Sequence, residues 1–134
     1  MIPSTNKLLT TELNVVTLPS KQHKMDPDKN KILNTCDGLE AVKQSIFKIL
    51  NTERYDYLIY SWNYGIELKN LYGKSPTYVC PELERMVKEA LSQDDRITAV
   101  DDFEFDISKK GVVSVSFTVH TFFGDLNEEM VVNI

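Results

Sequence analysis

Hydrophobic residues between positions 39 and 50 recur every three to four residues, which is the spacing of one face of an α-helix. The residues of this face are Leu39, Val42, Ile46, Ile49 and Leu50. Glu40 follows Asp37 by three residues, a spacing that predicts a capping box at the helix N-terminus. We therefore predict an amphipathic helix that begins after Asp37 and ends at Asn51 and Thr52.

A second helical stripe of hydrophobic residues predicts a helix from about Tyr78 to Ser92. Its apolar residues are Val79, Leu83, Met86, Val87, Ala90 and Leu91. Pro81 has no backbone N–H, so it is expected in the first turn of this helix, where no donor is needed.

The segment between the two helices is rich in aromatic side chains from residue 55 to residue 64. Its high strand propensity favours an extended segment. The residues that would share one face of it are Leu58, Tyr60, Trp62 and Tyr64. Gly65 and Gly73 then interrupt the chain, and a short helical piece is expected between them. The candidates for burial in that piece are Ile66, Leu68 and Leu71.

Strict alternation of apolar and polar residues predicts three strands in the last third of the chain. Ser108 to Gly111 has the composition of a hairpin turn, and Gly124 with Asp125 is expected to turn the chain again before a last strand from Glu128 to Ile134. The residues predicted to face inward are Phe103, Phe105, Ile107, Val113, Val115, Phe117, Val119, Met130, Val132 and Ile134.

The order of these elements predicts an α+β fold, with two main helices packed on a small antiparallel sheet and a C-terminal three-stranded meander. Upstream, Lys21 to Cys36 has room for two short strands around a turn at Pro27 to Asn30. Residues 1 to 18 have no hydrophobic period and are predicted to be an arm that is poorly ordered alone. Residues 19 to 134 are predicted to form a single domain.

Composition and charge narrow the classes of function. The chain has 134 residues, a net charge of −5 and a pI near 5.0, which argues against non-specific binding of nucleic acid. No apolar run approaches the roughly 18 residues of a membrane span, and no signal peptide is evident. Cys36 and Cys80 lack Cys-x-x-Cys spacing and are expected to be reduced thiols. We therefore expect a protein that is made in the cytoplasm.

Glu53 and Asp56 are the first candidates for chemistry, because glycoside hydrolysis uses a pair of carboxylates. One of the pair must be desolvated so that it keeps its proton. Arg54 lies between them, however, and an arginine favours the ionised form of any carboxylate that it contacts. A peptidoglycan-cleaving enzyme that uses Glu53 therefore remains an alternative, and a structural or binding role is the better interpretation.

Other polar groupings lack the spacing that their chemistry requires. The potential zinc ligands stand alone in the sequence, and they are His23, Cys36, Cys80 and His120. Ser45 and Ser61 lie in no Gly-x-Ser-x-Gly motif. The candidate calcium-binding acids lack the EF-hand order and indicate a solvated face; they are Asp94, Asp95, Asp101, Asp102, Glu104 and Asp106. We expect no cofactor, no metal and no small-molecule substrate.

Three stretches of the chain resemble the lysozyme-like wedge, or sheath-initiator, proteins of contractile phage-tail baseplates. They are Gly38 to Gln44, Ile49 to Arg54 and Tyr64 to Leu68. The likeness continues through Glu89 to Leu91, Asp94 to Ile97 and Val119 to Thr121, so that it covers nearly all of the chain from Asp37 onward. The string from Thr52 to Leu68 is most similar to members from prophages and phage-like elements of Gram-positive bacteria.

The resemblance implies a structural role without catalysis in the baseplate of a phage tail, a bacteriocin or a secretion machine. The implied partners are other wedge proteins and the first ring of sheath subunits, with no nucleic acid and no membrane. Glu53 and Arg54 correspond to the family's Glu–Arg turn, which docks on the wedge scaffold, although the Gly or Pro often found there is missing. A host regulatory or adaptor domain is the alternative from another class.

Two further surfaces are predicted to bind partners. Tyr60, Trp62 and Tyr64 are expected to combine core packing with interface contacts, because Tyr and Trp are enriched at interface hot spots. The last strands contain neither Lys nor Pro between Gly111 and Ile134, so an unprotected sheet edge is expected there. The candidate edge residues are Val113, Val115 and Val131. A partner strand would complete the sheet at this edge, unless strands near Lys24 or Leu33 cover it.

Overall fold

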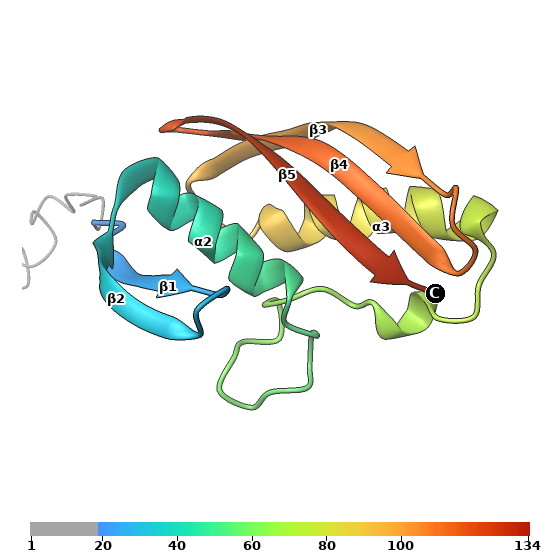
Figure 1. Cartoon of the computed structure of the whole chain (residues 1–134), viewed down its shortest axis with the longest axis horizontal. Helices are drawn as coiled ribbons and strands as arrows, with labels where there is room; N and C mark the ends of the chain where they lie inside the picture. Colours follow the sequence, from blue (N-terminus) through green and yellow to red (C-terminus); the bar gives the residue numbers. More distant parts are fainter. Residues whose placement is uncertain (1–18) are drawn as a thin grey trace, which may run out of the picture.

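The sheet that ends the chain has three antiparallel strands, and a computed structural model describes it together with the rest of residues 19–134. The strands are β3 (Ile97–Asp106), β4 (Val112–Thr121) and β5 (Gly124–Asn133). Each pairs with its neighbour in sequence, so β4 lies in the middle (Figure 1). The predicted C-terminal meander is confirmed. The predicted N-terminal arm, residues 1 to 18, lies outside the described residues.

Two helices, α2 (Gly38–Leu50) and α3 (Pro76–Leu91), cover the same face of this sheet (Figure 1). A 3-10 turn, η1 (Lys69–Leu71), lies between them in the chain. All the predicted stripe residues of α3 are buried, and so are four of the five predicted for α2. The α+β fold expected from the sequence is therefore confirmed.

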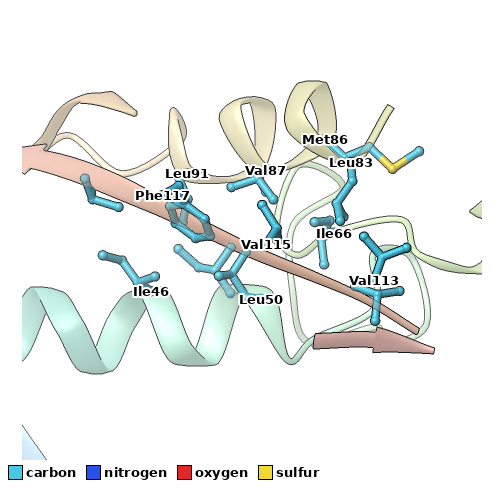
Figure 2. Close-up of a cluster of buried hydrophobic side chains, with 14 of the residues drawn as sticks. Ile46, Leu50, Ile66, Leu83, Met86, Val87, Leu91, Val113, Val115 and Phe117 are labelled. Atoms are coloured by element: carbon cyan, nitrogen blue, oxygen red, sulfur yellow. The ribbon is translucent and has the colours of Figure 1, made fainter. Parts of the chain in front are cut away.

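The hydrophobic core lies between the two helices and the sheet (Figure 2). Ile46 and Leu50 of α2 face Val87 and Leu91 of α3, and Figure 2 shows Val115 of the central strand between the two helices. Full burial of a valine or leucine side chain contributes about 1.5–3 kcal/mol. This single cluster joins α2, α3, β4 and β5 with Ile66 and Leu71 of the segment between the helices.

The N-termini of the helices differ from the prediction. The Asp37 carboxylate caps α2 by accepting from the N–H of Gly38 at 2.7 Å, but Glu40 forms an ion pair with Lys24 instead of a capping box. The capping box is therefore wrong, because a cation on the neighbouring hairpin competes for the glutamate. Lys24 belongs to β1, and its Nζ lies 2.6 Å from the carboxylate.

Helix α3 begins two residues earlier than predicted, at Pro76, so Pro81 lies in its second turn. Pro76 occupies the first helical position, which is where a proline is best tolerated. Pro81 removes the N–H that would bond to the carbonyl of Thr77, but both residues are exposed, so water can bond to that carbonyl.

Two details of the sheet also differ from the prediction. The second hairpin turns at Phe122 and Phe123, and Gly124 already pairs with Thr121, so β5 begins four residues before Glu128. Ile107 lies beyond the end of β3 and is 54% exposed, so it does not face the core.

The predicted strands near the N-terminus are confirmed as a separate hairpin of β1 (Gln22–Asp26) and β2 (Lys31–Cys36). Gln44 of α2 holds this hairpin by accepting from the N–H of Met25 at 2.8 Å and donating to the carbonyl of His23 at 2.7 Å. The hairpin pairs with no strand of the main sheet, so the alternative in which it covers that sheet's edge is wrong.

Candidate interaction surfaces

The segment after α2 forms a loop whose two ends are joined by backbone hydrogen bonds. The N–H of Ile66 donates to the carbonyl of Thr52 at 3.0 Å, and the N–H of Arg54 donates to the carbonyl of Ile66 at 3.1 Å. Gly65 has a φ of +94°, and a Cβ at this position would lie 2.5 Å from the Thr52 carbonyl oxygen. Only glycine therefore fits where the loop closes.

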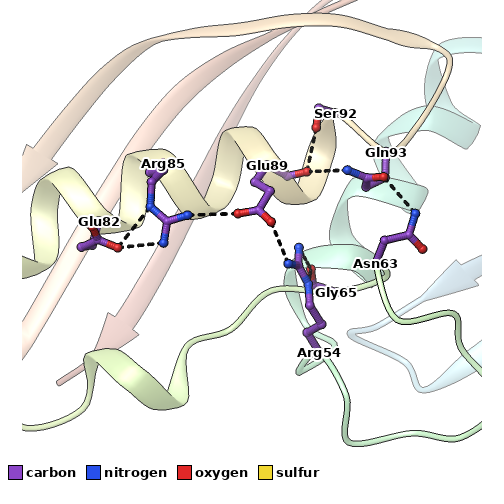
Figure 3. A network of polar contacts seen from close by, with 8 residues as sticks. All are labelled: Arg54, Asn63, Gly65, Glu82, Arg85, Glu89, Ser92 and Gln93. Carbon is purple, nitrogen blue, oxygen red and sulfur yellow. Dashed lines mark hydrogen bonds and ion pairs between the residues drawn. The ribbon is translucent and has the colours of Figure 1, made fainter.

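Arg54 stabilises the closed base of this loop through its side chain. Its guanidinium donates twice to the carbonyl of Gly65, from Nε at 3.3 Å and from Nη2 at 3.1 Å (Figure 3). Its Nη1 donates to Glu89 of α3 at 3.0 Å. The arginine is only 8% exposed, so the loop is fastened to α3 by a buried cation. The hydrogen bond from Arg54 lowers the pKa of Glu89, although partial burial opposes this shift.

Glu53 forms no ion pair with Arg54 and binds a different part of the backbone. Its carboxylate accepts from the N–H groups of Leu68 and Lys69 at 3.3 and 3.2 Å, at the start of η1. Asp56 accepts from Nζ of Lys69 at 2.7 Å. A turn that docks on the wedge scaffold needs accessible side chains, but Arg54 is buried, because contacts 11 and 35 positions away in sequence draw it into the interior.

Residues 55–64 form turns and bends at the far end of this loop, and the predicted extended strand is wrong. Only Glu53 and Ile66 form a β-bridge, so the aromatic residues have no neighbouring strand in residues 19–134 to pair with. Leu58, Ile59 and Trp62 are 104%, 85% and 76% exposed. The loop therefore presents an apolar tip to solvent.

The three aromatic residues predicted to bind partners lie differently on the loop. Trp62 is exposed, while Tyr60 stacks on Tyr64 with ring centroids 4.4 Å apart. Burial raises the pKa of Tyr64, which packs against the core. Trp62 and Tyr60 are thus available for contacts with a partner protein, and Tyr64 packs between Tyr60 and the hydrophobic core.

The sheet has two outer strands, β3 and β5, and only β5 pairs with β4 without a register shift. Val113 and Val115, predicted as edge residues, lie fully buried on the central strand, so their assignment to an edge is wrong. Val131 of β5 is 58% exposed. The N–H of Ile134 donates to the carbonyl of Gly111, and the β4–β5 register is unbroken. Alternation along the strand therefore directs the N–H and C=O groups of Glu129 and Val131 away from β4.

A groove with a volume of about 460 Å³ runs beside this edge. Its residues come from α2, from the loop and η1 region, and from β5, which lies above α2 in Figure 1. Among residues 19–134 its lining has three acids, Glu53, Glu128 and Glu129, and no Lys or Arg. Within the part of the chain that the structure describes, no strand pairs with the outer side of β5.

The candidate groups for catalysis or metal binding are dispersed. No three His, Cys, Asp or Glu side chains within residues 19–134 come together as a metal site. His120 lies between Asp101 and Asp125, with each ring nitrogen 2.8 Å from a carboxylate oxygen. Cys36 and Cys80 are free thiols. None of the helices in this part has the length and hydrophobicity of a membrane span.

Comparison with known proteins decides the family. Residues 16–124 match the family model of contractile injection system sheath initiators. The chain belongs to this family. It is 43% identical over 118 residues to the phage-like element PBSX protein XkdS of Bacillus subtilis, a match that covers 84% of this chain and 82% of that protein. The predicted family, in its phage-like element subgroup, is thus confirmed.

A solved structure supports the fold. The putative tail lysozyme of Geobacter sulfurreducens matches with a TM-score of 0.59 and 19% identity, over 71% of this chain and 89% of that one. At this identity the likeness concerns the fold alone. Family membership confirms the expected class of function: the sheath initiator is a structural component of a contractile-tail baseplate, and it works with other tail components.

Three residues that support or line these surfaces were not predicted from the sequence as functional residues. Glu89 anchors Arg54, Gly65 provides the carbonyl that Arg54 holds, and Glu128 lines the groove. A signal existed for Glu128, because the alternation of inward residues through Met130 and Val132 extends back to it. The role of Glu89 had no such signal, since it depends on a contact between distant segments.

Proposed function

We propose that this sheath initiator occupies the baseplate through the loop of residues 52–66 and offers the outer edge of β5 to an extended arm of a sheath subunit in the first ring. The observation that supports the proposal is the outer side of β5, which no strand of residues 19–134 pairs with, beside a groove lined by apolar residues and glutamates. An added strand would satisfy the outward N–H and C=O groups of Glu129 and Val131 and complete a four-stranded sheet.

The loop supports the second half of the proposal, docking on other wedge proteins. Glu53 and Arg54 hold the base of the loop, so the apolar tip is presented in a fixed conformation. A rigid apolar anchor loses little conformational entropy on binding, which favours affinity. Leu58 and Trp62 are the contact residues we assign to this surface, with Tyr60 beside them.

The same contacts support a role without catalysis. A general acid must hold a proton and point it toward a substrate. The Glu53 carboxylate instead accepts two backbone N–H groups, and that of Asp56 accepts from Lys69. Both carboxylates serve the fold of the loop. We place the protein in the host cytoplasm during assembly and in the baseplate of the finished particle.

Deletion of the gene in the particle-producing strain tests the proposal. Electron microscopy of the induced particles should find tail components without a polymerised sheath, and a plasmid copy of the wild-type gene should restore sheathed particles. Sheaths of normal length and number in the deletion strain would contradict the proposal. The purified protein is expected to leave a peptidoglycan suspension turbid between about pH 4 and pH 8.

A further inference from the structure

Glu128 occupies an unusual position on the edge strand. It alternates with Leu126 and Met130, so its side chain lies on the face of β5 that is turned toward the helices. Its Oε1 atom is buried and has no hydrogen-bond partner among residues 19–134. A buried carboxylate oxygen without a donor is destabilising, and such an atom in a native fold requires an explanation.

The charges around Glu128 leave this carboxylate undercompensated. Burial raises its pKa, and Lys43 of α2 opposes the shift only through space, without an ion pair. The other ionisable groups that line the groove are Glu53 and Glu129, which are also acidic, and Tyr57 and Tyr72. Within residues 19–134, the groove therefore lacks a cation at the point where the Glu128 carboxylate oxygen is buried and has no hydrogen-bond partner.

We propose that Glu128 recognises a Lys or Arg side chain on the extended segment that pairs with β5. This inference rests on the proposed function, and it adds the chemistry by which the edge selects its strand. Residues on neighbouring strands place their Cβ atoms about 5 Å apart, so a long basic side chain on the adjoining strand reaches Glu128 Oε1.

The walls of the groove suit such a side chain. Phe47, Leu50 and Met130 line it together with Glu128, and Phe47 is 43% exposed. An apolar wall accepts the aliphatic stem of Lys or Arg, while the carboxylate receives the charged group. A charged hydrogen bond of this kind, removed from water by the added strand, is stronger than a neutral one.

Glu128→Gln in the isolated protein is the first test. A carboxyl group whose pKa is raised in the folded state lowers the free energy of unfolding at pH values above that pKa. The effect disappears at low pH, where the group is protonated in both the folded and the unfolded state. The variant should therefore melt about 3 °C higher at neutral pH, with the gain vanishing below about pH 4. A lower melting temperature at neutral pH would mean that Glu128 stabilises the fold with Lys43, and would overturn the proposal.

Particles assembled with the same variant give the second test, with Glu104→Gln as the matched control. Glu104→Gln removes the same charge, but Glu104 is exposed on β3 and does not line the groove. Glu128→Gln should lower the yield of sheathed particles about tenfold or more, and Glu104→Gln should not. Normal sheath yield with Glu128→Gln contradicts the inference even where gene deletion abolishes sheaths; sheaths that survive gene deletion contradict the proposed function itself.

One outcome of the melting experiments would show that a segment of this chain, and not a partner, occupies the groove. Lys7 is the sole Lys or Arg in residues 1–18. If Lys7→Gln and Glu128→Gln change the melting temperature of the isolated protein by the same amount, and the double variant adds nothing, the occupant is the chain's own N-terminal segment. Independent effects, with no change for Lys7→Gln alone, are the expected result.

Discussion

The guanidinium of Arg54 holds the carbonyl of Gly65 with two hydrogen bonds, and this contact joins the two ends of the loop beneath its apolar tip. Arg54→Ala removes both bonds and the contact with Glu89. The variant should lose about 3 kcal/mol of unfolding free energy, because a buried carbonyl is left without its donor and a cavity remains. Urea unfolding of the purified variant measures this loss.

Arg85→Ala is the control for that measurement. Arg85 also contacts Glu89, at 3.1 Å, but its side chain is 56% exposed. An exposed ion pair contributes about 0–1 kcal/mol, so this variant should unfold close to the wild type. Equal losses in the two variants would show that the buried position of Arg54 has no special importance.

Glycine is required at position 65 for a reason that position 73 does not share. Both residues have positive φ angles, +94° and +78°, but a Cβ at Gly65 meets the Thr52 carbonyl and one at Gly73 meets nothing within 4 Å. Gly73→Ala should cost about 1 kcal/mol of strain. Gly65→Ala should cost several times more, measured as the difference in denaturation midpoint. Similar midpoints for the two variants would contradict the close approach at Gly65.

His120 predicts a pH dependence of stability. Hydrogen bonds to the carboxylates of Asp125 and Asp101 raise the pKa of His120, because only the protonated ring donates from both nitrogens. The stabilising effect is complete below the ordinary pKa of about 6.5 and is lost as the pH rises through the folded-state pKa. The melting difference between the wild type and His120→Gln should therefore shrink from about pH 6 to about pH 9.

Asp101→Asn combined with Asp125→Asn is the control, since it removes both carboxylates that favour the charged ring. In that background His120→Gln should have nearly the same effect at each pH. A melting difference that grows with pH in the wild-type background would reverse the sign of the proposed linkage.

The loop tip should matter for docking and not for folding. Leu58 is fully exposed, so Leu58→Asn should change the stability of the isolated protein by less than about 0.5 kcal/mol. Incorporation of the variant into particles, measured by mass spectrometry of purified tails, should fall. Phe122→Asn is matched, because Phe122 is 73% exposed on the β4–β5 turn. Equal incorporation of the two variants would contradict docking through the loop.

Hydrophobic periodicity predicted the parts of the fold that one segment determines. The stripes of α2 and α3 and the inward residues of β4 are buried as expected, because a face that packs on the core must repeat with the period of its element. The aromatic segment 55–64 failed this logic. Its residues favour strands, but a strand needs a partner, and the loop closure at Thr52 and Ile66 leaves none beside it.

The candidate surfaces were predictable only in part. Val131 was correctly placed on an exposed edge, while Val113 and Val115 were not, because alternation cannot reveal which strand takes the middle of a meander. The burial of Arg54 depends on Glu89, 35 positions later, and such a contact follows from tertiary packing. The residues around Arg54 in sequence therefore do not predict its burial.

Sheath assembly is proposed to begin when a sheath-subunit strand pairs with the outer side of β5, and Val131→Pro tests this pairing most directly. The N–H of Val131 points away from β4, so proline removes a donor from the outer edge and leaves the β4–β5 ladder intact. Val131→Thr keeps that donor and serves as the control. Circular dichroism should first confirm that both variants fold.

Sheath length on particles from the two strains is then measured by electron microscopy. Val131→Thr particles should have full-length sheaths, and Val131→Pro particles should have baseplates and tubes that contain the variant but lack a sheath. Full-length sheaths on particles that contain folded Val131→Pro protein would contradict the account.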